Sequence, residues 1–299
     1  MKQKTLGSGF DFEGKGLHTG CYSHMRLKPA PADTGIVFVR TDLGIEIPAL
    51  AENVSSTARS TALSAGKATV GTVEHVLSAL TGLGVDNAYI EIDNKEVPIL
   101  DGSARPYIEA ITPDSLVEQD AERRFLELPH EVFVENRKTG AYIRVTPAES
   151  PSIDLTIDFN SHVLGIQKVH WDLSVDYAKE IGRCRTFCFL HEILLLHSLG
   201  LVKGGDVGNA IVVCEKPISD WKIRRLARMF GQPDIKITSD GYLSNVDLRF
   251  PDECGRHKLL DIIGDLRLAG GFVNAHVEAY KPGHALNTSV SAEIRKTLE

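Results

Sequence analysis

The segment Arg256-His257-Lys258-Leu259-Leu260-Asp261-Ile262-Ile263-Gly264-Asp265 places three polar residues, His257, Asp261 and Asp265, four positions apart among leucines and isoleucines. A step of four residues turns an α-helix by about 400°, so the three side chains share one face. The apolar residues between them indicate a helix that is buried on its other sides. Burial of an imidazole one turn from a carboxylate costs free energy unless a charged or hydrogen-bonding group interacts with them. A divalent metal is one such partner, and the segment therefore predicts a helix at the centre of an active site.

A second helix–strand pair in the first half of the chain is similar to this one. Glu74-His75-Val76-Leu77 precedes Asn87-Ala88-Tyr89-Ile90-Glu91, as Arg256-His257-Lys258-Leu259 precedes Asn274-Ala275-His276-Val277-Glu278. The second copy holds five more residues between its His and its Glu, so the match indicates a duplication but could be chance. If the halves are duplicated, His75 and His257 are equivalent. A pseudo-twofold axis would then bring both imidazoles to one point at the interface between halves, a usual place for a site.

The same order of predicted elements appears on both sides of a polar segment. Residues 117–124 are predicted to link a first domain, 1–116, to a second, 125–299. The first half reads as a strand at 36–39, a helix at 72–83 and a strand at 88–92. The second half reads as a strand at 155–159, helices at 177–181 and 190–198, a strand at 210–213, a helix at 257–268 and a strand at 273–278.

The amino-acid composition limits the classes of function that this protein can have. The 299 residues are 42% hydrophobic and 24% charged, as in an ordinary soluble protein. A net charge of −7 leaves no basic excess to neutralise phosphates, which argues against broad nucleic-acid binding. The basic stretch at 221–228 is more readily explained as a solvated helix face than as a binding patch.

Cysteine usage and the N-terminus predict a cytoplasmic protein. The five cysteines are odd in number and scattered, and no two of them form a CxxC pair, which suits a reducing compartment. The first residues lack the apolar core of a signal peptide, and no run reaches the roughly 20 apolar residues of a membrane span.

Two histidines and one aspartate form a candidate metal set. His75, His257 and Asp261 would supply the three protein ligands of a catalytic Zn²⁺ and leave a fourth position for water. Glu74 stands beside His75 and could act as a base near the metal without binding it. Cys254-x-x-His257 is a rival pair that would place a thiolate on the ion, but no matching second pair exists.

His284 is a candidate general acid. It follows Gly283, and this pair predicts a tight turn from which the imidazole can face a pocket. Asp265, one turn beyond Asp261, could orient and charge-stabilise that imidazole, and an Asp-paired His is suited to proton transfer near pH 7.

Together these segments resemble the UDP-3-O-acyl-N-acetylglucosamine deacetylases, the zinc amidases that commit Gram-negative bacteria to lipid A synthesis. The similarity runs from near Lys4 to near Asn287. The motifs that carry it are Thr72-Val73-Glu74-His75, His257 to Asp265, Gly283-His284-Ala285-Leu286-Asn287, Gly16-Leu17-His18-Thr19-Gly20, Pro98-Ile99-Leu100-Asp101-Gly102-Ser103 and Arg185-Thr186-Phe187.

The resemblance implies an α+β fold of two similar domains, each a β-sheet layered with α-helices, with the helices sandwiched between the two sheets. It implies hydrolysis of the N-acetyl group of UDP-3-O-acyl-N-acetylglucosamine, with Zn²⁺ held by His75, His257 and Asp261. The remaining implied roles are those of general base (Glu74), general acid (His284), support for that acid (Asp265) and oxyanion stabilisation together with Zn²⁺ (Thr186).

The resemblance also implies where the substrate lies. Phe159, Phe187, Lys258 and Lys281 match residues that contact the nucleotide-sugar part. The segment after Thr186, with Phe189, Leu190 and Ile193, falls where the family builds its acyl-chain passage, as an insert in the second domain. Cys188 stands where many relatives carry Gly, and His191-Glu192 replaces other polar pairs, which puts the details of that passage in doubt. Some relatives carry a fused acyl-carrier-protein dehydratase, of which this chain shows no sign.

Two other classes of function stay open at this stage. The chain could be a binding module for a nucleotide sugar or an acyl ligand in which the metal is structural. It could also be a metal-independent interaction protein made of two sandwich domains. Retention of the metal, and the effect of its removal on the fold and on activity, would separate the three.

Overall fold

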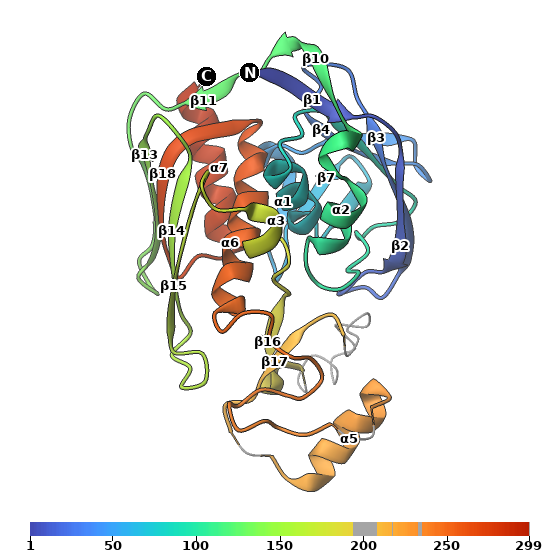
Figure 1. Cartoon of the computed structure of the whole chain (residues 1–299), viewed down its shortest axis with the longest axis vertical. Helices are drawn as coiled ribbons and strands as arrows, with labels where there is room; N and C mark the ends of the chain where they lie inside the picture. The colour runs from blue at the N-terminus through green and yellow to red at the C-terminus, as the bar shows by residue number, and fades with distance from the viewer. Residues whose placement is uncertain (194–207, 217, 233–234, 299) are drawn as a thin grey trace.

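Two sheets with the same strand order form the outer layers of the molecule, and helices lie between them (Figure 1). The computed structural model describes residues 1–193, 208–216, 218–232 and 235–298. The first sheet runs β2 (Phe10–Lys15), β3 (Tyr22–Pro29), β9 (Ala88–Ile92), β4 (Ile36–Arg40) and β5 (Ile45–Pro48). The second runs β12 (Val132–Asn136), β13 (Ala141–Pro147), β18 (Phe272–Tyr280), β14 (Ser152–Asp158) and β15 (Ile166–Asp172), and β11 (Phe125–Glu127) also pairs with β18.

The pairing pattern supports the duplication that the sequence indicates. In each sheet the central strand, β9 or β18, comes last along the chain. It pairs antiparallel with one neighbour, β3 or β13, and parallel with the other, β4 or β14. The α+β architecture with helices between two sheets is therefore as predicted.

Alternating burial turns one face of each sheet toward the helices. In β3, Met25 and Leu27 are buried and their neighbours point outward. In β14, Ile153 and Leu155 are buried in the same way. Successive side chains of a strand point to opposite faces, so this period of two gives each sheet one apolar face for the helix layer.

The helix layer is centred on α1 (Glu74–Gly82) and α6 (Glu253–Leu266), which pack against each other. Gly264 lies where they meet, because a Cβ placed there would come within 2.1 Å of the backbone oxygen of Glu74. α7 (His284–Leu298) packs on α6, and α2 (Arg105–Ala110) packs on α1. The short helix α3 (Tyr177–Glu180) lies beside α1 and α6 (Figure 1).

Smaller elements complete the fold. β6 (Val54–Ser56), β7 (Ala62–Ala65) and β8 (Ala68–Gly71) form a three-stranded sheet, and β1 (Lys2–Leu6) pairs with β10 (Leu116–Glu122). The 3₁₀ turns are η1 (Ala51–Asn53), η2 (Pro113–Ser115) and η3 (Arg267–Ala269). Most of the segment predicted as a linker, 117–124, is thus strand β10, whose backbone is paired with β1. The domain boundaries themselves stay a prediction.

A small unit projects from the sandwich below α6 (Figure 1). It contains β16 (Phe187–Phe189), β17 (Ile211–Val213) and α5 (Asp220–Phe230). Leu190, Ile193 and Leu226 belong to its own apolar cluster. Arg224, Arg225 and Arg228 of α5 have no ion pair among the described residues, in keeping with the solvated face expected for this stretch. Of the predicted helix at 190–198, residues 194–198 lie outside the described residues.

The sequence located most elements but misplaced one. β9 has the predicted bounds, α1 begins two residues later than predicted, and α6 begins four residues earlier. His284 was expected on a tight turn, but it is the first residue of α7, so that expectation was wrong. Pro282-Gly283 precedes a helix whose Val290 and Ile294 are fully buried, and their spacing of four was the missed signal. No helix in the described part of the chain is long and apolar enough to cross a membrane.

Candidate metal centre and active site

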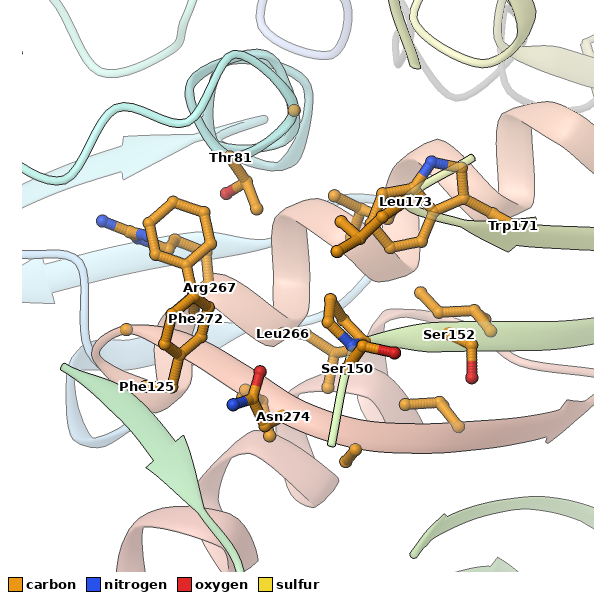
Figure 2. A pocket seen from close by; sticks show the side chains of 18 of the residues that line it. Thr81, Phe125, Ser150, Ser152, Trp171, Leu173, Leu266, Arg267, Phe272 and Asn274 are labelled. Carbon is orange, nitrogen blue, oxygen red and sulfur yellow. The ribbon is translucent and has the colours of Figure 1, made fainter. Parts of the chain in front are cut away.

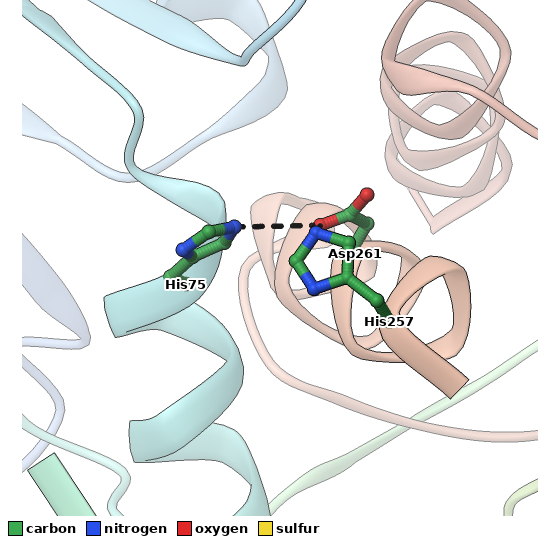
Figure 3. A group of neighbouring side chains, drawn as sticks. All are labelled: His75, His257 and Asp261. Atoms are coloured by element: carbon green, nitrogen blue, oxygen red, sulfur yellow. Dashed lines mark ion pairs between the residues drawn. The ribbon is translucent and has the colours of Figure 1, made fainter. Parts of the chain in front are cut away.

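Three buried side chains from the two domains converge between α1 and α6 (Figure 3). His75 comes from the first turn of α1, and His257 and Asp261 come from successive turns of α6. Oδ1 of Asp261 lies 3.7 Å from Nε2 of His75 and 3.3 Å from Nε2 of His257. One ligand atom from each of the three residues lies within 4.8 Å of the other two. The two histidines therefore meet at one point, as the pseudo-twofold argument expected.

The donor atoms of this group fit a divalent cation. Burial lowers the pKa of both imidazoles, that of His75 to about 3, so both are neutral near pH 7. Burial opposes ionisation of Asp261, yet neighbouring His257 and Lys258 hold its pKa far below the usual range. Oδ1 of Asp261 is fully buried and has no hydrogen-bond partner among the described residues. Two neutral imidazole nitrogens and an unpartnered carboxylate oxygen that face one another suit a metal such as Zn²⁺.

Backbone and side-chain contacts fix the orientation of His257. Its Nδ1 lies 3.0 Å from the carbonyl oxygen of Cys184, so Nδ1 donates and Nε2 keeps the lone pair for a ligand.

Cys254, the rival ligand, is buried, and it is not part of the group that could hold an ion. Lys258 donates to Oδ2 of Asp261 over 2.6 Å, which leaves Oδ1 for the cation.

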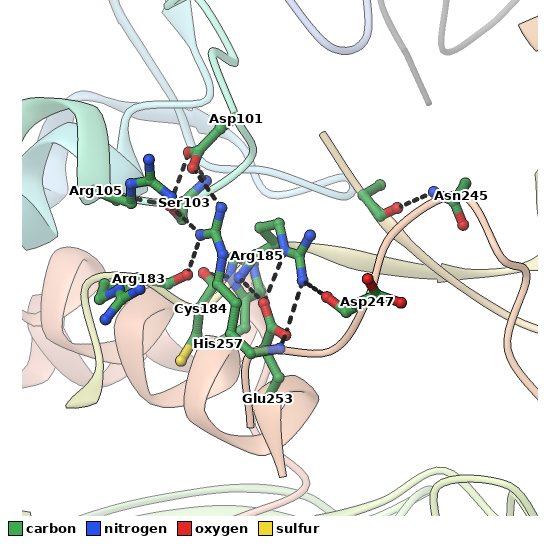
Figure 4. A network of polar contacts seen from close by, with 12 residues as sticks. Asp101, Ser103, Arg105, Arg183, Cys184, Arg185, Asn245, Asp247, Glu253 and His257 are labelled. Carbon is green, nitrogen blue, oxygen red and sulfur yellow. Dashed lines mark hydrogen bonds and ion pairs between the residues drawn. The ribbon is translucent and has the colours of Figure 1, made fainter. Parts of the chain in front are cut away.

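A buried ion pair holds the segment that carries the Cys184 carbonyl (Figure 4). Glu253 accepts hydrogen bonds from the backbone N of Arg185 at 3.0 Å and from its Nε at 2.9 Å. Arg249 donates from its backbone N to Glu253 and from Nη2 to Asp101 over 2.9 Å. The network ties the first turn of α6 to residues 184–185 and to the 98–103 motif of the first domain.

Glu74 precedes His75 at the start of α1 and is placed to exchange a proton. Its side chain is almost fully buried, and Oε2 accepts from the backbone N of Thr61 at 3.0 Å. Burial raises the pKa of Glu74 above the usual range, and the charge of His284 only partly opposes this. Oε1 lies 3.9 Å from Nε2 of His284. A carboxylate whose pKa is raised in this way is suited to acid–base catalysis near neutrality.

His284 is held by Asp265 from α6. Its Nδ1 lies 3.0 Å from Oδ2 of Asp265, and its Nε2 lies 3.9 Å from Oδ2 of Asp261. Burial would lower the pKa of His284, but the charges of Asp265 and Glu74 and the hydrogen bond to Asp265 outweigh it and raise the pKa. The imidazole can therefore carry a proton on Nε2, on the side of Glu74.

Two residues that the sequence reasoning did not assign complete this arrangement. Thr61 donates from Oγ1 to Oδ1 of Asp265 at 2.6 Å, and Asn287 donates from Nδ2 to Oδ2 at 2.9 Å. Asn287 lies one turn after His284 on α7, so its place in the 283–287 motif was the available signal. Thr61 precedes β7 and carries no local signal, because its partner is 204 positions away.

The 16–20 motif is tied to the start of α1 through Glu96. This carboxylate accepts from the backbone N of His18 at 2.8 Å and from Thr19 Oγ1 at 2.6 Å. It also accepts from Oγ1 of Thr72 at 2.9 Å, just before α1. Thr72 has a left-handed φ of 59°, and the bond to Glu96 helps to hold that backbone immediately ahead of Glu74.

Three of the four predicted substrate residues, Phe159, Phe187 and Lys258, form a connected group beside His257. The rings of Phe187 and His257 are 6.4 Å apart, and Nζ of Lys258 lies 5.6 Å from the Phe187 ring. Phe159, which is 42% exposed, packs edge-on against Phe187 at 5.5 Å. Lys281 forms an ion pair with Asp158, next to Phe159, over 3.1 Å.

Thr186 is fixed by main-chain hydrogen bonds to both domains. Its backbone N donates to the carbonyl oxygen of Gly102, and its own carbonyl accepts from the backbone N of Ile211. It immediately precedes Phe187, the ring neighbour of His257. Of the predicted acyl-passage residues, Phe189 packs against Phe159, and Leu190 and Ile193 are buried in the projecting unit.

Comparisons with known proteins agree with one another. A family model described as UDP-3-O-acyl N-acetylglycosamine deacetylase matches residues 3–227 and 232–296. The chain is 41% identical to a UDP-3-O-acyl-N-acetylglucosamine deacetylase of Teredinibacter turnerae, over 99% of this chain and 91% of the relative. A protein of the same name from Cellvibrio japonicus is also 41% identical, over 96% of this chain and 88% of the relative.

Longer relatives match as well. The chain is 38% identical to a protein of Porphyromonas gingivalis named bifunctional enzyme LpxC/FabZ, over the whole of this chain. It spans 65% of the length of that relative.

Proposed function

The chain belongs to the UDP-3-O-acyl N-acetylglycosamine deacetylase family, and we propose that it hydrolyses the N-acetyl group of UDP-3-O-acyl-N-acetylglucosamine with a bound zinc ion. The products would be acetate and UDP-3-O-acyl-glucosamine, in the committed step of lipid A biosynthesis. The observation that carries the proposal is the convergence of His75, His257 and Asp261, with Glu74 and His284 beside them.

His75, His257 and Asp261 would hold the ion. Zn²⁺ at such a site supplies a Lewis acid that polarises the amide carbonyl and lowers the pKa of water. Zinc fits the donor set of two neutral imidazoles and one carboxylate, and Lys258 occupies the second carboxylate oxygen.

Glu74 would take a proton from the attacking water. Its raised pKa makes it able to accept and then to release that proton near neutral pH. His284 would donate the proton on Nε2 to the nitrogen of the amide, so that the C–N bond breaks to a neutral amine. Asp265 would keep Nδ1 of His284 protonated and the ring in place.

Thr186 and the aromatic group would act on the substrate. The Thr186 hydroxyl would donate to the carbonyl oxygen as that oxygen gains charge. The nucleotide-sugar part would be received by Phe159, Phe187, Lys258 and Lys281. The first three are in contact beside His257, and Lys281 pairs with Asp158, the neighbour of Phe159 in the chain.

The proposed compartment is the cytoplasm. All five cysteines, Cys21, Cys184, Cys188, Cys214 and Cys254, are free thiols in the structure. Free thiols persist in a reducing compartment, so this pattern supports the proposal.

The decisive experiment is a deacetylation assay on UDP-3-O-acyl-N-acetylglucosamine with metal quantified in the same sample. We expect about one equivalent of zinc, since catalytic Zn²⁺ with three protein ligands is normally retained. Acetate release should be lost after dialysis against a chelator and restored by Zn²⁺. Circular dichroism should show that the fold survives removal of the metal. Unfolding of the apo-protein without any catalytic activity of the loaded form would favour a binding module with a structural metal.

A further inference from the structure

A cavity lies at the C-terminal ends of α1 and α6 (Figure 2). His75 and His257 lie toward the N-terminal ends of the same helices. Its volume is about 370 Å³, within the roughly 300–1,000 Å³ range of small-molecule pockets. The walls come from both domains and are mostly apolar, with Leu83 after α1, Leu266 on α6, Trp171 on β15 and Phe272 on β18. Such a pocket between domains is a common place for a ligand.

One charged side chain in this wall, that of Arg267, lacks a complete set of hydrogen-bond partners. Arg267 is only 5% exposed, and its Nη2 donates to the carbonyl oxygens of Val85 at 3.2 Å and Asp86 at 2.8 Å. Its Nη1 is buried and has no hydrogen-bond partner among the described residues. No ion pair found within the described chain includes Arg267, and besides the two carbonyl oxygens its charge interacts with the charge of Asp86 and the ring of Phe272.

The carboxylate whose charge acts on Arg267, that of Asp86, is already engaged by another cation. Arg123 forms an ion pair with Asp86 over 2.6 Å, and its guanidinium stacks on the ring of Phe272 at 4.1 Å. Arg267 stacks on the same ring at 4.4 Å. Burial lowers the pKa of Arg267 to about 10, which leaves it charged at neutral pH. Two buried guanidinium groups thus share the carboxylate of Asp86, and an anionic ligand would supply a second counter-charge.

The remaining polar groups narrow the class of ligand. Nε1 of Trp171 is also buried without a partner among the described residues, so the wall offers a second spare donor. The one carboxylate in the described wall, Glu149, is exposed. The Arg267 guanidinium and the Trp171 ring lie at opposite ends of the wall in Figure 2, so a head group on Arg267 meets a single spare cation. One cation suits a carboxylate, whereas a phosphate would bring more negative charge than it can balance. The apolar walls suit an aliphatic chain.

We propose that this cavity binds an aliphatic monocarboxylate, with its head group on Arg267 and its chain against Leu83, Leu266 and Trp171. The site is separate from the candidate metal centre and does not depend on the proposed deacetylation.

The test uses the two tryptophans of the chain as separate reporters. In a Trp221→Phe variant only Trp171 fluoresces, and in a Trp171→Phe variant only Trp221, on α5 of the projecting unit, does. Titration of each with bromododecanoate, whose bromine quenches on contact, should give saturable quenching of Trp171 and none of Trp221. Quenching of Trp221 alone, or unsaturable quenching of both, would overturn the site.

Recognition of the head group is tested on the same Trp221→Phe protein. Dodecanoate should displace the brominated probe at least about tenfold more tightly than dodecanol, which has the same chain and no charge. Arg267→Met, which keeps the apolar stem, should weaken binding of the probe by about tenfold or more. Equal competition by the acid and the alcohol would reject the proposal even if the Arg267 variant fails to fold.

Discussion

Asp265 and His284 come from adjacent helices and meet at 3.0 Å, with a carboxylate oxygen facing the ring nitrogen that points away from Glu74. Asp265 is fully buried, and Thr61 and Asn287 also donate to it. A carboxylate with three donors has little freedom to move. It therefore fixes which nitrogen of His284 faces the candidate metal centre.

Replacement of Asp265 by Asn should lower kcat by roughly 10–100-fold, because the amide keeps the shape but removes the charge that stabilises the imidazolium. Steady-state kinetics and metal analysis of the same sample test this. The metal content should stay near that of the parent protein. A loss of activity that follows a loss of metal would instead place Asp265 in metal binding.

Glu74→Ala and His284→Ala should each lower kcat by roughly 10²–10⁴ with metal retained, as expected of acid–base residues. Steady-state kinetics with metal analysis measures both. Ser289→Ala is a suitable control, since this exposed hydroxyl donates to the carbonyl of Ala285 in its own helix and to no other group in the described part of the chain. Near-normal turnover by both site variants would refute their assigned roles.

Glu253→Gln should destabilise the protein by about 3 kcal/mol, because it leaves the buried guanidinium of Arg185 without its counter-charge. Denaturant unfolding measures this. We also expect weaker zinc retention, since Glu253 holds the segment whose Cys184 carbonyl orients His257.

The control for the buried pair is Glu109→Gln, in an exposed pair with Arg105. It should change stability by no more than the error of the measurement, because exposed ion pairs contribute little. Equal effects of the Glu253 and Glu109 substitutions would mean that the buried pair is not a support of the site.

Gly264→Ala should push α1 and α6 apart, because the added Cβ would overlap the backbone oxygen of Glu74. We expect a loss of roughly 1–3 kcal/mol in spite of the better helix propensity of Ala, together with weaker metal binding. Gly208→Ala serves as the control, since a Cβ at that position would meet no heavy atom of the described residues within 4 Å. Unchanged metal affinity in the Gly264 variant would show that the helix spacing can relax.

Alkylation should distinguish Cys21 from the other four cysteines. Burial raises the pKa of Cys188 to about 12 and that of Cys214 to about 11, and it raises the pKa values of Cys184 and Cys254 further. Thiols with raised pKa values stay protonated at mildly alkaline pH, where only the thiolate reacts. Intact-mass spectrometry should show one adduct in the native protein and adducts on all the cysteines in denaturant. Rapid modification of Cys188 would contradict its placement.

Local patterns in the sequence predicted those parts of the site that lie on regular elements. The four-residue spacing of His257, Asp261 and Asp265 predicted one helix face, and α6 has that face buried. The similarity between the two halves predicted that His75 would meet His257, and the matching sheets explain why. The start of α7 was missed because Pro282-Gly283 was interpreted as a turn alone.

Contacts between distant segments could not be predicted in this way. Thr61 meets Asp265 across 204 positions, and Glu253 meets Arg185 across 68. Neither Thr61 nor Glu253 belongs to a periodic sequence pattern that would mark it as part of the site. Their roles depend on how two domains dock, which no short window of sequence contains.

The division of the ligands between the two halves has a mechanical consequence. A cation bound to His75 on one side and to His257 and Asp261 on the other would clamp the domains together, so its binding free energy would resist their separation. Any strain that separates the two domains at their interface would lower the affinity for the cation before either domain begins to unfold. The activity of the protein would then report whether the two domains remain in contact.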